Sequence, residues 1–256
     1  MNESRSSNGS SPAQAHEPEV TRDTLLRGRV VVHQPARGYR FSLDPVLLSG
    51  FVSLPLGRFI DLGAGSGVLS FLLLARDPHA AATAIEIQPR LAALAARGAA
   101  ENGMTERLTL VANDFLAWAQ TQAQESFDVV ASNPPFYTVE GGHLSPNPER
   151  ALAHHEVALP LHEWTAAAAR LLTPSGRIAV VFPAERKDAL FEALQRQGFG
   201  DVRLRWARPT QVRPVHRLLV EASRGQPRVR AEDDLIVHTS EGEFSHEVKG
   251  YLGENS

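Results

Sequence analysis

The sequence contains no cysteine among its 256 residues. This absence excludes disulfide bonds, thiolate zinc sites and cysteine nucleophiles. The sequence also lacks any run near the ~20 apolar residues that a membrane-spanning helix needs. Residues 1–20 are rich in Ser, Asn, Gly, Pro and Glu and lack the apolar core of a signal peptide. We therefore expect a disordered tail over residues 1–20 and a cytoplasmic protein without membrane contact.

The formal net charge of −3 argues against a protein coated in nucleic acid, but the charge is distributed unevenly. Residues 201–230 carry eight arginines and two acidic residues, which makes this window +6 and the remainder of the chain −9. Such a window usually marks only a solvated face, and a phosphate-binding surface is the alternative.

Apolar runs of strand length alternate with helical patterns from about residue 58 onward. This alternation predicts a doubly wound α/β fold with a mostly parallel sheet of seven strands. The predicted strands cover residues 58–62, 82–87, 108–111, 127–132, 177–182, 202–207 and 215–222. The predicted helices cover residues 68–76, 89–102, 115–120, 161–172 and 184–197. The last two strands are expected to form an antiparallel hairpin at the edge of the sheet.

The length favours a single domain, over residues 21–224 including an N-terminal extension. Residues 225–256 are expected to be a C-terminal tail that packs on this domain, with one strand-like run over residues 235–238.

A glycine-rich turn follows the first predicted strand. Asp61 and Leu62 lead into Gly63–Gly67, with the sequence GAGSG, and then into a helix. A dinucleotide fingerprint would need its third glycine one residue later, where Val68 stands, and Asp61 would repel a pyrophosphate. The turn therefore favours a cofactor without phosphates, such as S-adenosylmethionine. The residues expected to contact it here are Asp61, Gly63, Ala64, Gly65 and Gly67.

Two further acidic residues lie at or just beyond the ends of the next two predicted strands. Glu86, with Ile87 beside it, is placed to accept hydrogen bonds from ribose hydroxyls, and Asp114 is placed to accept from an adenine amino group next to the apolar Phe115. Taken alone, the glycine-rich turn could be an ordinary connector, and each acidic residue could be an ordinary solvated side chain. Together they fall at the carboxyl ends of successive strands, where open α/β sheets bind ligands.

The strand over residues 127–132 runs into Asn133, Pro134, Pro135 and Phe136. A double-proline turn that closes a strand is the simpler interpretation. The chemical interpretation is that the Asn133 side chain and the Pro134 carbonyl accept the N–H groups of a planar nitrogen, and that Phe136 stacks on the substrate. We accordingly predict Asn133, Pro134, Pro135 and Phe136 as the catalytic segment, with Asn133 also contacting the cofactor.

These residues resemble the class I methyltransferases with an Asn-Pro-Pro-aromatic motif, and within them the bacterial tRNA adenine-N6 methyltransferases that act beside the anticodon of valine tRNA. The resemblance covers about residues 24–250 and includes Gly38–Asp44 and Glu149–Glu156. It implies a Rossmann-like fold, S-adenosylmethionine as cofactor and tRNA as partner. It also implies that Tyr39, Arg40 and Asp44 line the substrate pocket. Phe136 stands where many relatives carry tyrosine.

The basic window supports an RNA substrate, because Arg203 and Arg205 alternate along a strand and would project from one face toward phosphates. Other planar nitrogens remain open as acceptors, namely a protein glutamine, an rRNA guanine N2 and a DNA adenine. A non-catalytic RNA-binding module is the rival class. No metal is expected, because the adjacent His154 and His155 point apart. The oligomeric state stays open, with a monomer favoured.

Overall fold

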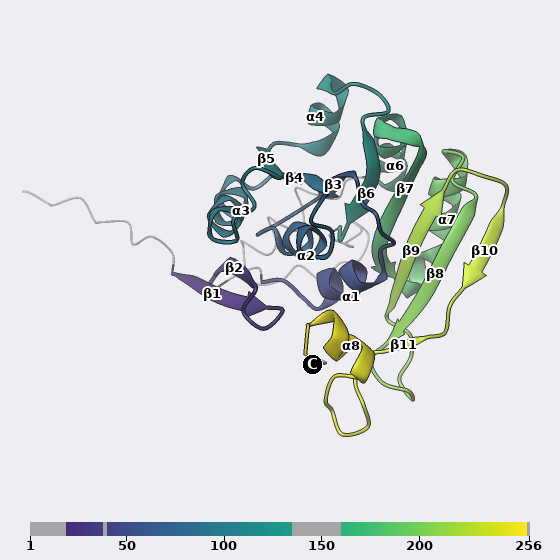
Figure 1. Ribbon diagram of the computed structural model, residues 1–256. Coiled ribbons are helices and arrows are strands. Elements are labelled where there is room, and N and C mark those ends of the chain that lie inside the picture. Colours follow the sequence, from purple (N-terminus) through teal and green to yellow (C-terminus); the bar gives the residue numbers. More distant parts are fainter. Residues whose placement is uncertain (1–18, 38–39, 135–159, 255–256) are drawn as a thin grey trace, which may run out of the picture.

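The computed structural model describes residues 19–37, 40–134 and 160–254. Within these ranges a nine-stranded sheet forms the centre of the molecule, with the order β10-β8-β9-β7-β6-β3-β4-β5 and β11 beside β8 (Figure 1). Strand β9 runs antiparallel to both β7 and β8, and the other pairs are parallel. The strands are β3 (Arg58–Leu62), β4 (Ala81–Glu86), β5 (Leu108–Ala112), β6 (Phe127–Ser132), β7 (Leu172–Pro183), β8 (Asp201–Arg208), β9 (Arg217–Ser223), β10 (Arg228–Ala231) and β11 (Leu235–Ile236).

The predicted doubly wound, mostly parallel sheet is confirmed, and all seven predicted strands are present. Three details differ. The sheet has nine strands rather than seven, because the segment after residue 224 adds β10 and β11. The antiparallel β8–β9 pair is therefore not the edge, since β10 lies outside β8. Residues 173–176, which lie between the predicted helix over 161–172 and the predicted strand over 177–182, are part of the long strand β7, whose pairing with β6 shifts register between Phe127 and Val129.

Helices cover both faces of the sheet, and alternating strand residues feed two separate cores. Phe59 of β3 and Val129 of β6 belong to the core with α1, α2 and α8, whereas the next residues, Ile60 and Val130, belong to the core with α4, α6 and α7. This alternation is the two-residue period of a strand buried on both sides. The helices are α1 (Asp44–Phe51), α2 (Val68–Arg76), α3 (Pro89–Glu101), α4 (Phe115–Thr121), α6 (Leu161–Leu171), η1 (Ala184–Arg186), α7 (Lys187–Arg196) and α8 (His246–Tyr251). None of the helices in the described part of the chain is long and apolar enough to cross a membrane.

A separate antiparallel hairpin precedes the sheet, formed by β1 (Val20–Leu25) and β2 (Val30–Pro35). The Asn102 side chain at the end of α3 accepts from the Val31 amide at 2.7 Å and donates to the Val31 carbonyl at 2.8 Å, so it continues the hairpin's hydrogen bonding. His33 is buried and its Nε2 lies 2.7 Å from a Glu101 carboxylate oxygen. The hairpin is thus fastened to the end of α3 (Figure 1).

Several arginines donate to the carbonyl groups that a helix leaves unpaired at its end. Arg76 donates to the carbonyls of Ser49 and Val52 at the end of α1. Arg107, Arg170 and Arg224 do the same after α2, α4 and α6. With twenty-four arginines and two lysines, the chain relies on the guanidinium group, whose planar fork can bridge several carbonyls.

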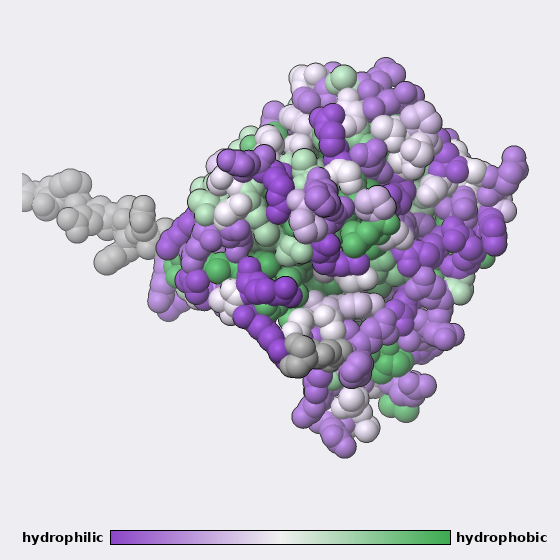
Figure 2. All heavy atoms as spheres, viewed as in Figure 1, coloured by the Kyte–Doolittle hydropathy of each residue, from purple (hydrophilic) through white to green (hydrophobic). Residues whose placement is uncertain are grey.

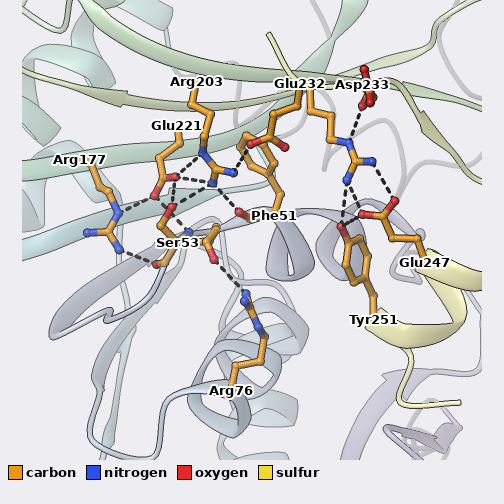
Figure 3. Close-up of polar contacts among 12 residues, drawn as sticks. Phe51, Ser53, Arg76, Arg177, Arg203, Glu221, Glu232, Asp233, Glu247 and Tyr251 are labelled. Carbon is orange, nitrogen blue, oxygen red and sulfur yellow. Dashed lines mark hydrogen bonds and ion pairs between the residues drawn. The ribbon is translucent and has the colours of Figure 1, made fainter. Parts of the chain in front are cut away.

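Glu221 of β9 is the centre of a buried polar network (Figure 3). Its carboxylate accepts from the Ser53 hydroxyl at 2.7 Å, from Arg177 of β7 at 2.6 Å and from Arg203 of β8 at 2.5 Å. The Arg203 guanidinium also lies 3.9 Å from the ring centre of Phe51. Burial alone would raise the pKa of Glu221, but the hydrogen bonds from Ser53 and Arg203 and the charges of Arg203 and Arg177 outweigh it and hold the pKa low. The network joins three strands to the end of α1.

Arg205 extends this side of the sheet to the C-terminal helix. It donates to the Asp233 carbonyl at 2.7 Å and to the Glu247 carboxylate, and it contacts the Tyr251 hydroxyl. Figure 3 labels these three partners. The side chains of Arg203 and Arg205 are only 20% and 13% exposed. The two arginines do project from one face, as their alternation predicts, but α1 and α8 cover that face. Their donors are used within the molecule, which gives them a structural role in place of the predicted phosphate contacts.

The substitution Glu221→Gln should lower the free energy of unfolding by roughly 2–4 kcal/mol, because it leaves two partly buried guanidinium groups without their shared carboxylate. Urea unfolding measures this loss. The matched control is Glu192→Gln, which breaks the exposed pair with Arg196 at i and i+4 and should cost less than about 0.5 kcal/mol. Equal losses in the two variants would show that Glu221 stabilises the protein no more than an exposed ion pair does, which would contradict this prediction.

Candidate active site

The carboxyl ends of four neighbouring strands meet at one edge of the sheet. Leu62, the last residue of β3, pairs with Ser132 of β6 on one side and with Ile85 of β4 on the other. The end of β4 in turn lies beside the end of β5 through Glu86 and Ala112. Because the chain leaves β3 toward β4 while β6 lies on the opposite side, this edge is the topological switch point at which open α/β sheets bind ligands.

The glycine-rich turn leads from β3 into α2 at this switch point. The amides of Gly63 and Ala64 both donate to the Ile85 carbonyl at 3.0 Å, which ties the turn to β4. Gly63, Gly65 and Gly67 all have positive φ angles, of 74°, 56° and 86°. A side chain is disfavoured in this region of backbone conformation, so the turn needs glycine at these positions.

Two of these glycines meet different surroundings. A Cβ atom on Gly67 would lie 2.7 Å from the Phe71 ring, and a Cβ atom on Gly98 of α3 would lie 2.7 Å from the same ring. The fully buried Phe71 ring therefore packs between the turn and α3. Beside Gly63, by contrast, no atom of the described chain other than those of Gly63 and its two neighbours in sequence lies within 4 Å of the Cβ position. The turn is thus packed against the Phe71 ring at Gly67 and open at Gly63, where a ligand can approach the backbone.

Asp61 is buried and fixes the start of α2. Its carboxylate accepts from the amide of Ser70 at 3.0 Å and from the Ser70 hydroxyl at 2.7 Å. Burial raises the pKa of Asp61 to about 6, the hydrogen bonds from Ser70 oppose this shift, and the charge of Glu86 adds to it. The predicted cofactor residue thus also holds the turn against α2, a task that the sequence pattern did not reveal.

Glu86 closes the turn from the end of β4. One carboxylate oxygen accepts from the Gly65 amide at 2.8 Å and the other from the Gln88 amide at 2.9 Å. Burial raises the pKa of Glu86, and these backbone donors act in the opposite direction. A carboxylate offers about four acceptor positions, so two remain for ribose hydroxyls. This remaining capacity, with the open space beside Gly63, fits the adenosine part of S-adenosylmethionine.

Asp114 caps the N-terminus of α4 through a 2.9 Å hydrogen bond from the Ala117 amide to its Oδ1 atom. The capping task uses one oxygen and leaves Oδ2 for the predicted adenine amino group. Phe115 is buried beneath it, and Ile87 is half-buried after β4. The structure therefore places these predicted cofactor residues along neighbouring strand ends.

Asn133 and Pro134 directly follow β6 and are half-buried. The preceding Ser132 is fully buried and its hydroxyl donates to the Leu62 carbonyl at 2.9 Å, which fixes the end of β6 against the strand that enters the glycine turn. Pro135 and Phe136 lie outside the described residues, as do Tyr39 and the run over residues 149–156. The first half of the predicted catalytic segment is thus next to the turn.

The segment between β2 and α1 reaches the same edge. Gln34 is buried, donates to Asp23 at 2.7 Å and accepts from the Phe41 amide at 2.8 Å. Arg40 donates to the same Asp23 carboxylate at 2.9 Å.

At the other end of this segment, Asp44 accepts from Arg217 at 3.0 Å. Arg217 pairs with Pro183, the last residue of β7, which places Asp44 at the carboxyl edge. Sequence reasoning missed the hairpin residues Asp23 and Gln34, which hold this segment.

Comparison with known proteins identifies the family. A family model for the methyltransferase small domain matches residues 44–205, which include the glycine turn, the strand-end acids and Asn133. The chain belongs to this methyltransferase family. The methyltransferase is 31% identical over 212 residues to a tRNA1(Val) (adenine(37)-N6)-methyltransferase of Vibrio campbellii, with 82% of this chain and 86% of the relative covered. A relative of the same description from Porphyromonas gingivalis is also 31% identical, with 84% and 88% covered.

Solved structures share the fold of this methyltransferase at low sequence identity. A predicted O-methyltransferase from Agrobacterium tumefaciens superposes with a TM-score of 0.67 at 21% identity, covering 83% of this chain and 97% of that one. An S-adenosylmethionine-dependent methyltransferase from the same organism gives a TM-score of 0.56 at 16% identity, covering 83% and 72%. These likenesses establish the Rossmann-like fold.

The raised pKa of Asp61 predicts a pH dependence of stability. Because the folded state holds the proton up to about pH 6 and the unfolded state loses it near 3.8, the stability contributed by protonated Asp61 is lost as the pH rises through this window. The wild type should therefore lose on the order of 3 kcal/mol relative to Asp61→Asn between pH 4 and 7. Urea titrations at several pH values measure the difference. The exposed Asp188→Asn provides the control, and a pH-independent difference for Asp61→Asn would contradict the assignment.

Proposed function

We propose that this methyltransferase transfers the methyl group of S-adenosylmethionine to N6 of an adenine beside the anticodon of tRNA, in the cytoplasm. The supporting observation is the position of Asn133 and Pro134. They directly follow β6, and β6 pairs with β3, the strand that leads into the glycine turn. The relatives that match most of the chain are named for adenine 37 of tRNA1(Val), and this is the acceptor we propose here.

The exocyclic nitrogen of adenine is a weak nucleophile because its lone pair is delocalised into the ring. On this proposal the Asn133 side-chain oxygen and the Pro134 carbonyl accept its two N–H groups and orient the lone pair toward the methyl carbon. With S-adenosylmethionine bound, the bond from nitrogen to the methyl carbon would form as the bond from that carbon to the sulfonium sulfur breaks, and the nitrogen would then release a proton to solvent. S-adenosylmethionine supplies an activated methyl group and its own leaving group, so the task of the protein is positioning.

The strand-end acids hold the cofactor on this proposal. Glu86 binds the ribose hydroxyls with its two remaining acceptor positions, and Asp114 receives the adenine amino group with Oδ2. Asp61 lies beneath the turn, where its carboxylate attracts the positive charge of the cofactor without touching solvent. An adenine in a stacked loop also has to leave the stack to reach Asn133.

The test is a panel of acceptors incubated with methyl-labelled S-adenosylmethionine: unmodified tRNA, rRNA, DNA and a translation release factor. We expect N6-methyladenosine in tRNA, identified by mass. Label in a glutamine or in a guanine would overturn the acceptor while leaving the fold and the cofactor in place. No label in any acceptor would favour a non-catalytic RNA-binding protein.

Asn133→Ala should lower kcat with tRNA by roughly 100-fold or more, because the acceptor nitrogen loses the group that orients it. Affinity for S-adenosylmethionine, measured by calorimetry, should change little. Gln195→Ala is the matched control, since it removes an exposed amide side chain from α7. Normal turnover in Asn133→Ala would refute the positioning mechanism.

A further inference from the structure

The arginines of this protein mostly bond within the molecule, which makes the exceptions informative. Among the residues that the structure describes, four exposed arginines have side chains without a hydrogen bond, ion pair or ring contact: Arg37, Arg97, Arg213 and Arg228. A guanidinium stays charged at every physiological pH, so an arginine that the fold does not use is available to an anionic partner.

Arg213 lies at the edge that carries the candidate active site. It belongs to residues 209–216, which connect β8 to β9. Since β7 and β8 are both antiparallel to β9, β8 ends at the same edge as β7 and β6. The start of β9 is two strand positions from β6, which is about 10 Å at the usual strand spacing. A few nucleotides of RNA can therefore span the distance between a base held at Asn133 and Arg213.

The connection is held by hydrogen bonds although its side chains are exposed. The Arg213 amide donates to the Thr210 carbonyl at 3.2 Å, and Arg208 donates to the Arg213 carbonyl at 3.3 Å. The His216 carbonyl accepts from the Ala184 amide at 3.2 Å, which ties the connection to the end of β7. A fixed loop presents its side chains at a lower cost in conformational entropy than a flexible one does.

An exposed apolar side chain stands next to this arginine. Val212 is 90% exposed, the highest value among the large hydrophobic residues of the described chain. On the face seen in Figure 2, hydrophobic residues are interspersed with hydrophilic ones. A cation beside an apolar side chain suits contact with a phosphate and with the neighbouring ribose or base.

The charge around the connection also favours an anionic partner. Residues 209–216 include no acidic residue. The acids that flank them are paired with other arginines, Asp234 with Arg208 and Asp44 with Arg217 at 3.0 Å. The positive charge of Arg213 is therefore not cancelled by a local ion pair.

We infer that residues 209–216 contact the RNA substrate, with Arg213 bound to a backbone phosphate and Val212 packed on an adjoining ribose or base. This inference rests on the proposed function and adds the face that the RNA covers. Within the basic window, it moves the RNA contact from the faces of β8 to the connection that follows it.

The test compares Arg213→Ala with Arg228→Ala. The control removes another exposed arginine whose side chain has no ion pair. Arg228 is the first residue of β10, and its backbone pairs with Asp201, the first residue of β8, at the end of β8 opposite to residues 209–216. For Arg213→Ala we expect a roughly three- to tenfold rise in the Kd for unmodified tRNA. The slope of log K against log salt should become shallower by about 0.7–0.9, as for the loss of one phosphate contact. Cofactor affinity and thermal stability should not change, since the exposed Arg213 side chain makes no hydrogen bond or ion pair within the described part of the molecule.

Arg228→Ala should match the wild type in all four measurements. If Arg213→Ala also matches the wild type while the wild type methylates tRNA, this inference is overturned and the proposed function stands. If the wild type neither binds nor methylates tRNA but labels a protein or DNA acceptor, the proposed function fails and this inference fails with it.

Discussion

A carboxylate inside a protein must be matched by cations and hydrogen-bond donors, and the placement of α1 depends on how Glu221 meets this requirement. The residues that satisfy it come from β7, β8 and the segment just after α1, so they fix one end of that helix against the sheet. The other end is fixed by the pair between Asp44 and Arg217. With both ends held, the segment between the hairpin and α1 has to run to the carboxyl edge, where the methyltransferase site lies.

The acids of the site combine structural and binding tasks. Asp61 and Asp114 each receive hydrogen bonds from the start of a helix, and Glu86 receives them from the turn and from the start of α3. A side chain that is already held by the backbone loses little freedom when a ligand arrives, which favours affinity. The same bonds explain why these residues stand at strand ends: each one satisfies backbone amides that a helix leaves unpaired.

The sequence predicted the sheet and the glycine turn because both depend on local patterns. Strand β6 and helix α2 begin and end at the predicted residues, since buried parallel strands read as apolar runs and the helix follows a glycine turn. The hairpin was missed because β2 is buried by α3 rather than by neighbouring strands of the central sheet. Its buried residues include His33, a polar residue that a sequence pattern does not assign to the core. The role of Arg203 and Arg205 could not be foreseen either, because Glu221, Glu232 and Glu247 reach them only through tertiary structure.

The preference for arginine has a practical consequence for chemical handling of the protein. Its only lysines are Lys187 and Lys249, and both lie outside the network around Glu221. Among the side chains, amine-directed dyes, biotin tags and acylating reagents can therefore react at two surface positions. Guanidinium groups do not react with such reagents under mild conditions, so the ion pairs that position α1 stay intact. The enzyme can accordingly be coupled to a bead or a sensor surface through its amines without altering the bonds that shape its site.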